Sequence, residues 1–234
     1  MISAVVITRN EEDNIRPCLI GLDWCDEVVV VDDFSEDRTV KLAGEFGAKV
    51  YKRKLNNNFS TQRNFGLNKT RGEWVLFIDA DEKVSSELAQ EIQEKIKNTS
   101  YSGFLIKRKG IIEDYLLRFA RRGSGFWVRE VHETWQVRGR IGKLHSPILH
   151  STPEVGGLIE KINKYSTIHA LGNKNEGKKV NIFKIIFMPI FKFLYYFIVR
   201  RAYKEGSHGF VFSSLMSFHS FLAWSKQWEN QNSR

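Results

Sequence analysis

The sequence predicts an α/β fold in which helices cover a mostly parallel β-sheet, and three observations support this prediction. Short apolar runs alternate with helical patterns over about the first hundred residues, as expected for a parallel sheet covered on both faces. The run at residues 74–78 (WVLFI) lacks polar alternation, which is typical of a strand buried on both faces. After Ser102 the pattern changes, and alternating stretches at 126–138 predict an antiparallel part.

The expected elements follow one another along the chain. Strands are expected at residues 2–7, 27–31, 49–51, 74–78 and 104–107, with antiparallel strands within 126–138. Helices are expected at residues 14–22, 35–46, 61–68, 86–97 and 158–170. No strand is expected at 110–119, where apolar and charged residues mix without a clear period. We expect residues 1–175 to form the sheet domain and residues 176–234 to form a separate helical tail.

Size and cysteine content indicate an ordinary intracellular protein. A chain of 234 residues suits one globular domain with an appendage. Cys18 and Cys25 show no metal-ligand spacing and are typical of reduced thiols. Met1 leads directly into a strand-like segment, so we expect no secretory signal.

The positive charge is concentrated in one segment. The chain has a net charge of +9, and residues 178–204 contain seven Lys or Arg residues and no acidic residue. These cations are interspersed with Phe, Ile and Tyr, a composition typical of contact with an anionic membrane surface. A nucleic-acid-binding protein would instead spread its charge over a folded face, so we expect no nucleic-acid partner.

Residues 182–199 form the most apolar stretch of the chain. Lys184, Pro189 and Lys192 interrupt it, which favours a helix that lies in the membrane interface. A turn at 206–209 leads to a second apolar stretch at 210–228. Two alternatives remain open: the first helix crosses the membrane, or both helices pack on the sheet domain or form a dimer interface.

Clustered carboxylates follow the apolar run at 74–78. Asp79 and Asp81 have only Ala80 between them, so their side chains can point the same way and share one hard divalent cation. Mg²⁺ or Mn²⁺ takes oxygen ligands from one or two carboxylates and completes its shell with water and substrate phosphates. The alternative is a solvated acidic turn before the helix whose cap is expected at Ser85 or Ser86.

Two further strands are expected to end on polar residues at the same edge of the sheet. The first is followed by Thr8–Glu11, and the second by Asp32 and Asp33. Ligands of open α/β sheets bind at the carboxyl ends of the strands, so this edge is the expected site. The chain has neither GxGxxG after the first strand nor GxxxxGK[ST], which argues against a dinucleotide cofactor and against a P-loop NTPase.

With these motifs in place, the chain resembles the inverting family 2 glycosyltransferases of GT-A fold. The matching segments are AVVITRNEEDNI, EVVVVDDFSEDRT, STQRNFGLNKTRGEWVLFIDADE and VREVHETW. Within the family, the chain is most similar to small β-1,4-glucosyltransferases that add glucose to the inner core of lipopolysaccharide. The resemblance covers residues 1–170, and the turn at 203–209 looks like the C-terminal tails of such enzymes.

The resemblance implies a nucleotide-sugar site and a metal site. By this resemblance, Asp33 or its neighbour Asp32 receives the uracil ring or the ribose, and Asp79 and Asp81 hold the metal on the diphosphate. His150 is implied as a third metal ligand or a diphosphate contact, with a structural hydrogen bonder as the alternative. The positions that match the nucleotide-sugar site are Thr8, Asn10, Glu11, Asp32, Asp33, Arg63, Asn64 and Asp79.

The catalytic base is implied at Glu133. Many family members carry an ED or DD pair where this chain has His132 and Glu133, and Glu133 then resembles the base of the subset with an HE motif. Glu130 is a second candidate. A single displacement that inverts the anomeric carbon needs only one base, whereas a glycoside hydrolase needs two carboxylates across the scissile bond.

The expected function is therefore metal-dependent transfer of a sugar, with glucose expected, from a UDP-sugar to a membrane-linked glycan such as the lipopolysaccharide inner core. A polyprenyl-phosphate or a capsule precursor is the alternative acceptor. A sugar nucleotidyltransferase would need a Gly-rich basic loop where this chain has TRNEEDN, and a non-enzymatic membrane adaptor would leave three acidic strand ends without a role. The expected location is the cytoplasm, peripheral on the inner face of the bacterial inner membrane.

Overall fold

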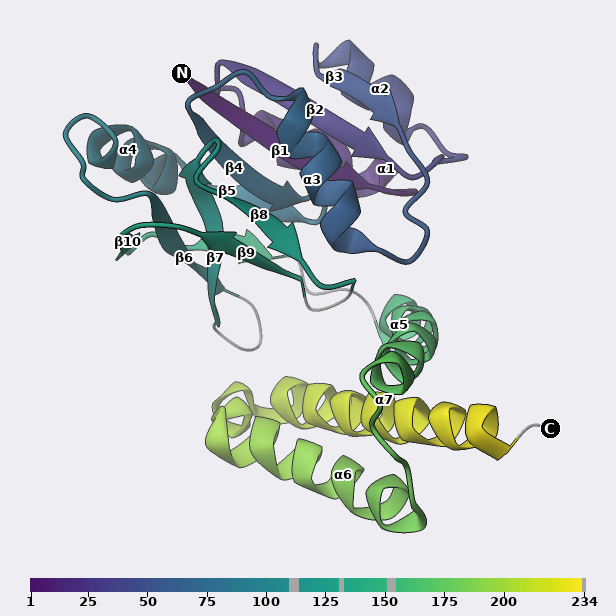
Figure 1. Ribbon diagram of the computed structural model, residues 1–234. Coiled ribbons are helices and arrows are strands. Elements are labelled where there is room, and N and C mark those ends of the chain that lie inside the picture. Colours follow the sequence, from purple (N-terminus) through teal and green to yellow (C-terminus); the bar gives the residue numbers. More distant parts are fainter. Residues whose placement is uncertain (110–113, 131–132, 151–154, 233–234) are drawn as a thin grey trace. The chain divides into compact units, whose positions relative to one another are not determined.

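The computed structural model divides the chain into two compact units, residues 1–151 and 152–234 (Figure 1). The structure describes residues 1–109, 114–130, 133–150 and 155–232. The expected boundary at residue 175 differs from this division, because helix α5 (Val155–Asn175) packs along α7 (Gly206–Asn232). Helix α5 therefore belongs to the second unit and not to the sheet domain.

The N-terminal part of the sheet is parallel, as the sequence predicts. Strand β1 lies between β2 and β4, and β3 pairs with the outer side of β2. The strand interiors are apolar because helices and a hairpin cover both faces of the sheet. These strands are β1 (Ile2–Thr8), β2 (Glu27–Asp32), β3 (Lys49–Lys52) and β4 (Trp74–Asp79).

Four helices accompany these strands, and they confirm the predicted alternation of strands and helices. Helices α3 and α4 each begin at a side-chain cap: Asn58 accepts from the Thr61 backbone N–H and Ser85 from the Leu88 N–H, which satisfies N–H groups that have no partner within the helix. Helix α2 begins at Thr39, later than expected. The helices are α1 (Glu12–Ile20), α2 (Thr39–Glu45), α3 (Phe59–Lys69) and α4 (Ser86–Lys95).

Beyond β4 the sheet combines antiparallel and parallel pairs. Strand β7 pairs antiparallel with both β4 and β6. Strands β10 and β11 pair parallel with β6, and β5 pairs antiparallel with β11 at the edge of the sheet. Strands β8 and β9 pair antiparallel with each other, as predicted for residues 126–138. The bounds are β5 (Glu82–Val84), β6 (Gly103–Lys109), β7 (Asp114–Arg121), β8 (Gly125–Val128), β9 (Thr134–Val137), β10 (Ile141–Lys143) and β11 (Ile148–His150).

Four of these strands were not expected from the sequence. Strands β5, β10 and β11 contain three residues each, too few to show a period of two. Strand β7 occupies most of the stretch for which no strand was predicted. It lies in the middle of the sheet, between β4 and β6, so its pairing partners and not its own pattern determine its conformation.

Two apolar clusters fill the two faces of the sheet. One contains side chains of α1, α2 and α4, and the other joins α3 to β8 and β9. Gly66 allows α3 to lie close to the sheet, because a Cβ atom at this position would be 2.5 Å from Val5 Cγ1. Helix α3 carries two of the predicted site residues, so this close packing fixes their height above the sheet.

The buried carboxylate of Glu27 joins the amino ends of three strands and a loop. Its Oε1 accepts from Lys49 Nζ at 2.7 Å, and its Oε2 accepts from Ser3 Oγ at 2.7 Å and from the Arg71 N–H at 2.8 Å. Burial raises the pKa of Glu27, but the hydrogen bonds from Lys49, Ser3 and Arg71 outweigh it and hold this pKa below its usual value. Glu27 therefore stabilises the edge of the sheet opposite the strand ends.

The second unit is helical. Helix α6 (Ile182–Leu194) continues through a π-helical turn at Tyr195–Val199, and a 3₁₀ turn (Ala202–Glu205) leads into α7. The turn expected at 206–209 is wrong: α7 already begins at Gly206. The chain reverses between Arg201 and Gly206, which adopt φ values of 59° and 58°.

Gly209 lies inside the first turns of α7. Its backbone passes so close to the Ala202 carbonyl that a side chain would collide with it. Gly209 therefore allows the close contact of α7 with the preceding turn, whereas Gly206, with a φ of 58°, lies at the junction between that turn and α7. In the described part of the chain, one helix, residues 182–199, has the length and composition of a membrane-crossing helix.

Candidate active site

The polar ends of β1, β2 and β4 meet at one edge of the sheet. Thr8 is in register with Asp32 of β2, and Ile7 is in register with Asp79 of β4. The prediction that the three polar strand ends converge is therefore confirmed. The edge lies where the strand order reverses around β1, the usual ligand position in open α/β sheets.

The loops after β1 and β2 are locked together by Asn10. Its backbone N–H donates to Ser35 Oγ at 2.8 Å, and its Oδ1 accepts from the Glu36 N–H at 2.9 Å. Asn10 and Phe34 both adopt a left-handed φ of 52°, a conformation that costs free energy for residues with side chains. Both loops are thus held in one defined shape.

Asp32 and Asp33 stabilise the same loops. Asp32 is fully buried, and its two oxygens accept from the Ser35 N–H and hydroxyl at 3.0 and 2.5 Å. Asp33 accepts from the Leu55 N–H at 2.9 Å and from Arg9 Nη1 at 3.0 Å. Both predicted nucleotide ligands therefore lie at the site with their carboxylates engaged by protein groups.

The two other residues predicted after β1 differ in their contacts. The hydroxyl oxygen of Thr8 is buried and has no hydrogen-bond partner within the described part of the chain. The backbone N–H of Glu11 donates to Thr39 Oγ1 at 2.8 Å, and its carboxylate accepts from Asn14 at 2.8 Å. Glu11 thereby joins the β1 loop to the start of α2.

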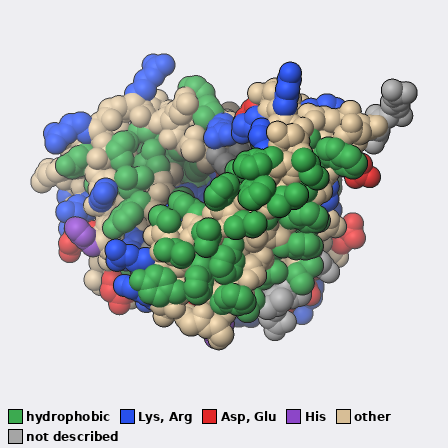
Figure 2. Space-filling model, turned by 90° about the horizontal axis from the view of Figure 1, so that it is seen from below, with side chains coloured by type: hydrophobic (Ala, Val, Ile, Leu, Met, Phe, Trp, Pro, Cys, Tyr) green, Lys and Arg blue, Asp and Glu red, His purple; other side chains and the backbone are tan. Residues whose placement is uncertain are grey.

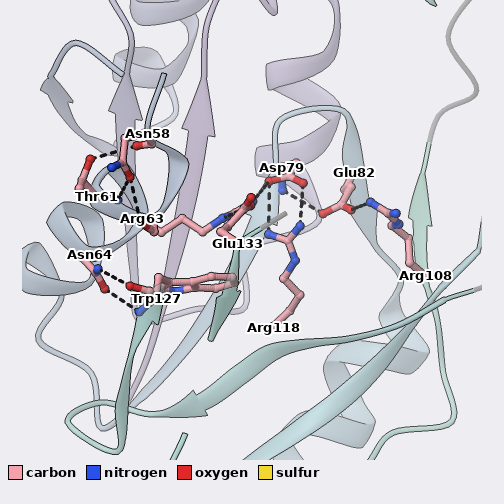
Figure 3. A network of polar contacts seen from close by, with 11 residues as sticks. Asn58, Thr61, Arg63, Asn64, Asp79, Glu82, Arg108, Arg118, Trp127 and Glu133 are labelled. Carbon is pink, nitrogen blue, oxygen red and sulfur yellow. Dashed lines mark hydrogen bonds and ion pairs between the residues drawn. The ribbon is translucent and has the colours of Figure 1, made fainter. Parts of the chain in front are cut away.

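Arg63 lies at the centre of the site (Figure 3). Its Nε donates to Glu133 Oε1 and its Nη2 donates to Asp79 Oδ1, both at 2.8 Å. The guanidinium group is buried and lies 4.7 Å from the centre of a Trp127 ring, a cation–π arrangement. Arg63 thus connects the predicted base to the end of β4.

Asp79 is held by two guanidinium groups. Besides Arg63, Arg118 of β7 donates to its two oxygens at 3.0 and 3.4 Å. Desolvation raises the pKa of Asp79, but the positive charges of Arg118 and Arg63 outweigh it and hold this pKa well below the usual range. Asp79 therefore carries a negative charge that the protein itself neutralises.

Arg118 was not found from the sequence. It comes from β7, for which no strand was predicted, and no spacing along the chain relates it to the D-x-D motif. Only the pairing of β7 with β4 brings it there, since Leu76 of β4 is in register with Phe119. The sequence signal that could have indicated it is an arginine within an otherwise apolar run, LLRFA.

Glu82 supports the turn that carries the D-x-D motif. It is fully buried, its Oε2 accepts from the Asp79 N–H at 2.9 Å, and its Oε1 lies 3.7 Å from Arg108 Nη1. Burial and the neighbouring charge of Asp79 raise the pKa of Glu82. The side chain of Glu82, directly after the D-x-D motif, therefore stabilises the turn at 79–82 by accepting a hydrogen bond from its first residue.

Asn64 makes contacts different from those implied by the resemblance. Its amide donates to the Trp127 carbonyl at 2.9 Å and accepts from the Trp127 N–H at 2.8 Å (Figure 3). This pair mimics a strand-to-strand pairing and fixes β8 against α3. In the structure Asn64 therefore positions β8 and the Trp127 ring beneath Arg63.

The structure distinguishes the two candidates for the base. Glu133 lies in the Arg63 network and its side chain is 15% exposed, whereas Glu130 is exposed and contributes its backbone carbonyl to the Phe59 N–H at 2.9 Å. His132 lies outside the described residues. The geometry favours Glu133 as the residue that faces the end of β4.

Asp81 and His150 face each other across the turn. Asp81 Oδ2 lies 3.5 Å from His150 Nε2, and the hydrogen bond to Asp81 raises the pKa of His150. One carboxylate and one imidazole this close can be ligands of a single Mn²⁺ ion. The remaining positions would be filled by diphosphate and water oxygens.

The three predicted metal ligands, Asp79, Asp81 and His150, do not come together as one group. No group of three or more His, Cys, Asp or Glu side chains that could hold a metal ion occurs among the described residues. Asp79 is oriented toward Arg63 and Arg118, whereas Asp81 and His150 remain together. Asp81 and His150 are therefore the two predicted metal ligands that the structure brings together.

A mostly parallel sheet with this arrangement at its strand ends defines a GT-A-type sugar transferase. The model of the family "Glycosyl transferase family 2" matches residues 3–143. The chain belongs to this family, and it is a nucleotide-sugar glycosyltransferase. The predicted GT-A fold and the predicted enzyme class are thereby confirmed.

Curated and solved relatives agree with this assignment. The lipopolysaccharide core biosynthesis glycosyltransferase LpsC of Rhizobium meliloti is 28% identical over 245 residues, which cover 96% of this chain and 91% of LpsC. S. aureus TarS 1–349 in complex with UDP is 17% identical, with a TM-score of 0.54 over 100% of this chain and 92% of TarS.

A third similar protein was solved with a metal ion. Glucosyl-3-phosphoglycerate synthase from Mycobacterium tuberculosis, in complex with Mn²⁺, UDP and phosphoglyceric acid, is 16% identical. Its TM-score is 0.52, and the match covers 68% of this chain and 73% of that protein. At these identities, the two solved structures establish the shared fold.

Proposed function

We propose that this glycosyltransferase moves a sugar, for which we propose glucose, from a UDP-sugar to a membrane-linked glycan acceptor such as the inner core of lipopolysaccharide. The reaction is metal-dependent and inverts the anomeric carbon. The observation that carries the proposal is the bridge from Asp79 through Arg63 to Glu133, with both contacts at 2.8 Å. It places the carboxylate of Glu133 beside the end of β4, at the sheet edge where the donor would bind.

Glu133 acts as the general base in this proposal. Arg63 holds one oxygen of its carboxylate, which orients the group, and a carboxylate held in this way can take the acceptor's hydroxyl proton on its other oxygen. The deprotonated hydroxyl attacks the anomeric carbon, the bond to the diphosphate breaks, and the electron pair leaves with the diphosphate. One displacement of this kind inverts the anomeric centre.

The diphosphate leaving group needs positive charge. A Mn²⁺ or Mg²⁺ ion held by Asp81 and His150 would neutralise the charge that develops on the diphosphate. Thr8, with its buried hydroxyl, and the loops fixed by Asn10, Asp32 and Asp33 are proposed to bind the nucleoside. The UDP complex of TarS and the Mn²⁺ and UDP complex of glucosyl-3-phosphoglycerate synthase support this choice of donor and metal.

The acceptor is proposed from similarity along nearly the whole chain. LpsC, which covers 96% of this chain, is described as a lipopolysaccharide core biosynthesis glycosyltransferase. A polyprenyl-phosphate or a capsule precursor is the second candidate, because a basic and apolar C-terminal segment suits any lipid-linked acceptor. Transfer assays with each acceptor would distinguish the two.

Calorimetric titration with UDP tests the donor and the metal together. We expect binding with Mn²⁺ present and much weaker binding with excess chelator. Asp81→Ala should reduce the metal-dependent part of the affinity, whereas Lys83→Ala, an exposed neighbour on β5, should leave it unchanged. If the folded protein binds no UDP under either condition, the proposed UDP-sugar donor is wrong.

A further inference from the structure

Helices α6 and α7 expose a continuous apolar face. Among the described residues, most of the exposed large hydrophobic side chains lie between residues 182 and 228. Figure 2 shows these hydrophobic side chains gathered over α6 and α7. Its principal members are Ile182, Phe183, Ile186, Phe187, Ile190, Phe191, Leu194, Ile198, Phe210, Val211, Phe218, Phe221 and Trp228.

The outward apolar face is distinct from the face of α6 that packs on α7. Ile182, Ile186 and Ile190 recur at helical spacing and are each about half exposed or more. Pro189 instead is buried, and its carbonyl accepts from Ser217 Oγ at 2.9 Å. Packing within the second unit therefore leaves a second apolar stripe uncovered, far more than the scattered apolar residues usual on soluble proteins.

Basic side chains accompany this face. Residues 178–204 carry seven Lys or Arg residues and no acidic residue. Lys184 Nζ lies 5.0 Å from a Trp224 ring centre, and Lys192 Nζ lies 5.2 Å from that of Tyr196. Long cationic side chains that lie along aromatic rings next to an apolar stripe are typical of helices at the headgroup level of a bilayer.

We propose that the α6–α7 face binds the surface of an anionic lipid bilayer, with both helices lying in the interface. Apolar area enters the acyl boundary while the cations contact anionic headgroups. The segment 182–199 is long enough to cross a bilayer, but its two lysines and its proline favour a helix that lies in the interface. A second copy related by a two-fold axis would bring the same basic segments together, which is electrostatically unfavourable.

Vesicle flotation of the full chain tests this proposal. We expect binding to vesicles of phosphatidylcholine with phosphatidylglycerol, and much weaker binding to phosphatidylcholine alone. Ile186→Asn, on the exposed face, should weaken binding about tenfold, because it removes an apolar side chain from the acyl boundary. Ile20→Asn is the matched control, since Ile20 is 56% exposed on α1 and Ile186 is 51% exposed.

The contribution of the basic side chains to membrane binding is tested separately. Lys204→Gln should weaken binding to the anionic vesicles about fivefold, and high salt should release the protein. Circular dichroism verifies that both variants fold. Equal binding to both kinds of vesicle, or binding to neither, would overturn the proposal.

Two further results would contradict the interfacial arrangement. Resistance to extraction at high salt and alkaline pH would identify a crossing helix. Sedimentation could also show that the protein is a dimer and that Ile186→Asn makes it a monomer. If vesicle binding is then unchanged, the face binds a second copy of the chain and not a membrane. The vesicle assay uses no nucleotide, so a failed UDP titration and a failed flotation are independent results.

Discussion

Asn64 provides the sharpest test, because the resemblance and the structure give it different roles. The family pattern implies a contact with the nucleotide, whereas the structure engages both ends of its amide with the backbone of Trp127. Asn64→Ala removes both hydrogen bonds and leaves the Trp127 N–H and carbonyl without their partner. We expect the substitution to destabilise the sheet domain and not to abolish nucleotide binding.

The magnitude follows from the two contacts. Each hydrogen bond contributes about 0.5–1.5 kcal/mol, and a buried group left without a partner costs about 1–3 kcal/mol. Trp127 is almost fully buried, so we expect the free energy of unfolding to fall by about 2–3 kcal/mol. For a domain of this size the melting temperature should fall by about 4–12 °C.

Thermal melts followed by circular dichroism, together with UDP titrations, separate the two roles. Asn68→Ala is the matched control, because Asn68 is exposed on the same helix α3 and the same gain in helix propensity applies. A melting temperature equal to that of the control, combined with a tenfold or greater loss of UDP affinity, would refute the structural role. The stability measurement does not depend on the proposed donor.

Three further predictions concern the base, the buried carboxylate and the sheet. Glu133→Gln should nearly abolish transfer while UDP still binds, and Glu130→Gln should retain transfer in the same assay; the reverse result would move the base to Glu130. Glu27→Gln should lower the free energy of unfolding by about 1–3 kcal/mol at neutral pH. Because the folded-state pKa of Glu27 is lowered, the difference in stability between the two proteins should disappear as the pH falls through that pKa. Urea melts at a series of acidic pH values measure this difference, and a difference that stays constant would contradict the reasoning. Gly66→Ala should cost about 1–3 kcal/mol, because its Cβ would meet Val5, whereas Gly44→Ala, which meets nothing within 4 Å, should be neutral or slightly stabilising in the same melts.

The parallel part of the fold could be predicted because its signals are local. The run at 74–78 is buried on both faces, so it has no polar position, and the alternation of strands and helices leaves few topologies. The part of the sheet beyond β4 could not be predicted to the same extent. Strands of three residues such as β10 carry no period, and β7 adopts its conformation because β4 and β6 lie on both sides of it.

The candidate site likewise contains residues that could be predicted from the sequence and residues that could not. Thr8, Asp32 and Asp79 each end a strand, and sheet geometry alone brings such residues together. Arg118 reaches Asp79 only through the pairing of two distant strands, and no pattern in the sequence encodes that register. Side chains at strand ends are therefore visible in a sequence, whereas Arg118, which neutralises one of them from a distant strand, is not.

The two aspartates of the D-x-D motif look equivalent in the sequence, but the structure gives them different surroundings. Asp79 lies among three arginines and two other carboxylates: Arg63 joins it to Glu133, Arg118 contacts it directly, and Arg108 lies by Glu82.

With every group ionised, the three guanidinium groups and three carboxylates of this network carry no net charge. A diphosphate that binds beside it would bring negative charge that the network does not offset. Asp81, paired with His150 instead, is the position at which a divalent cation can supply the missing positive charge. The charge balance around Asp79 thus supports the proposed requirement for a metal, which rests on Asp81 more than on its neighbour in the motif.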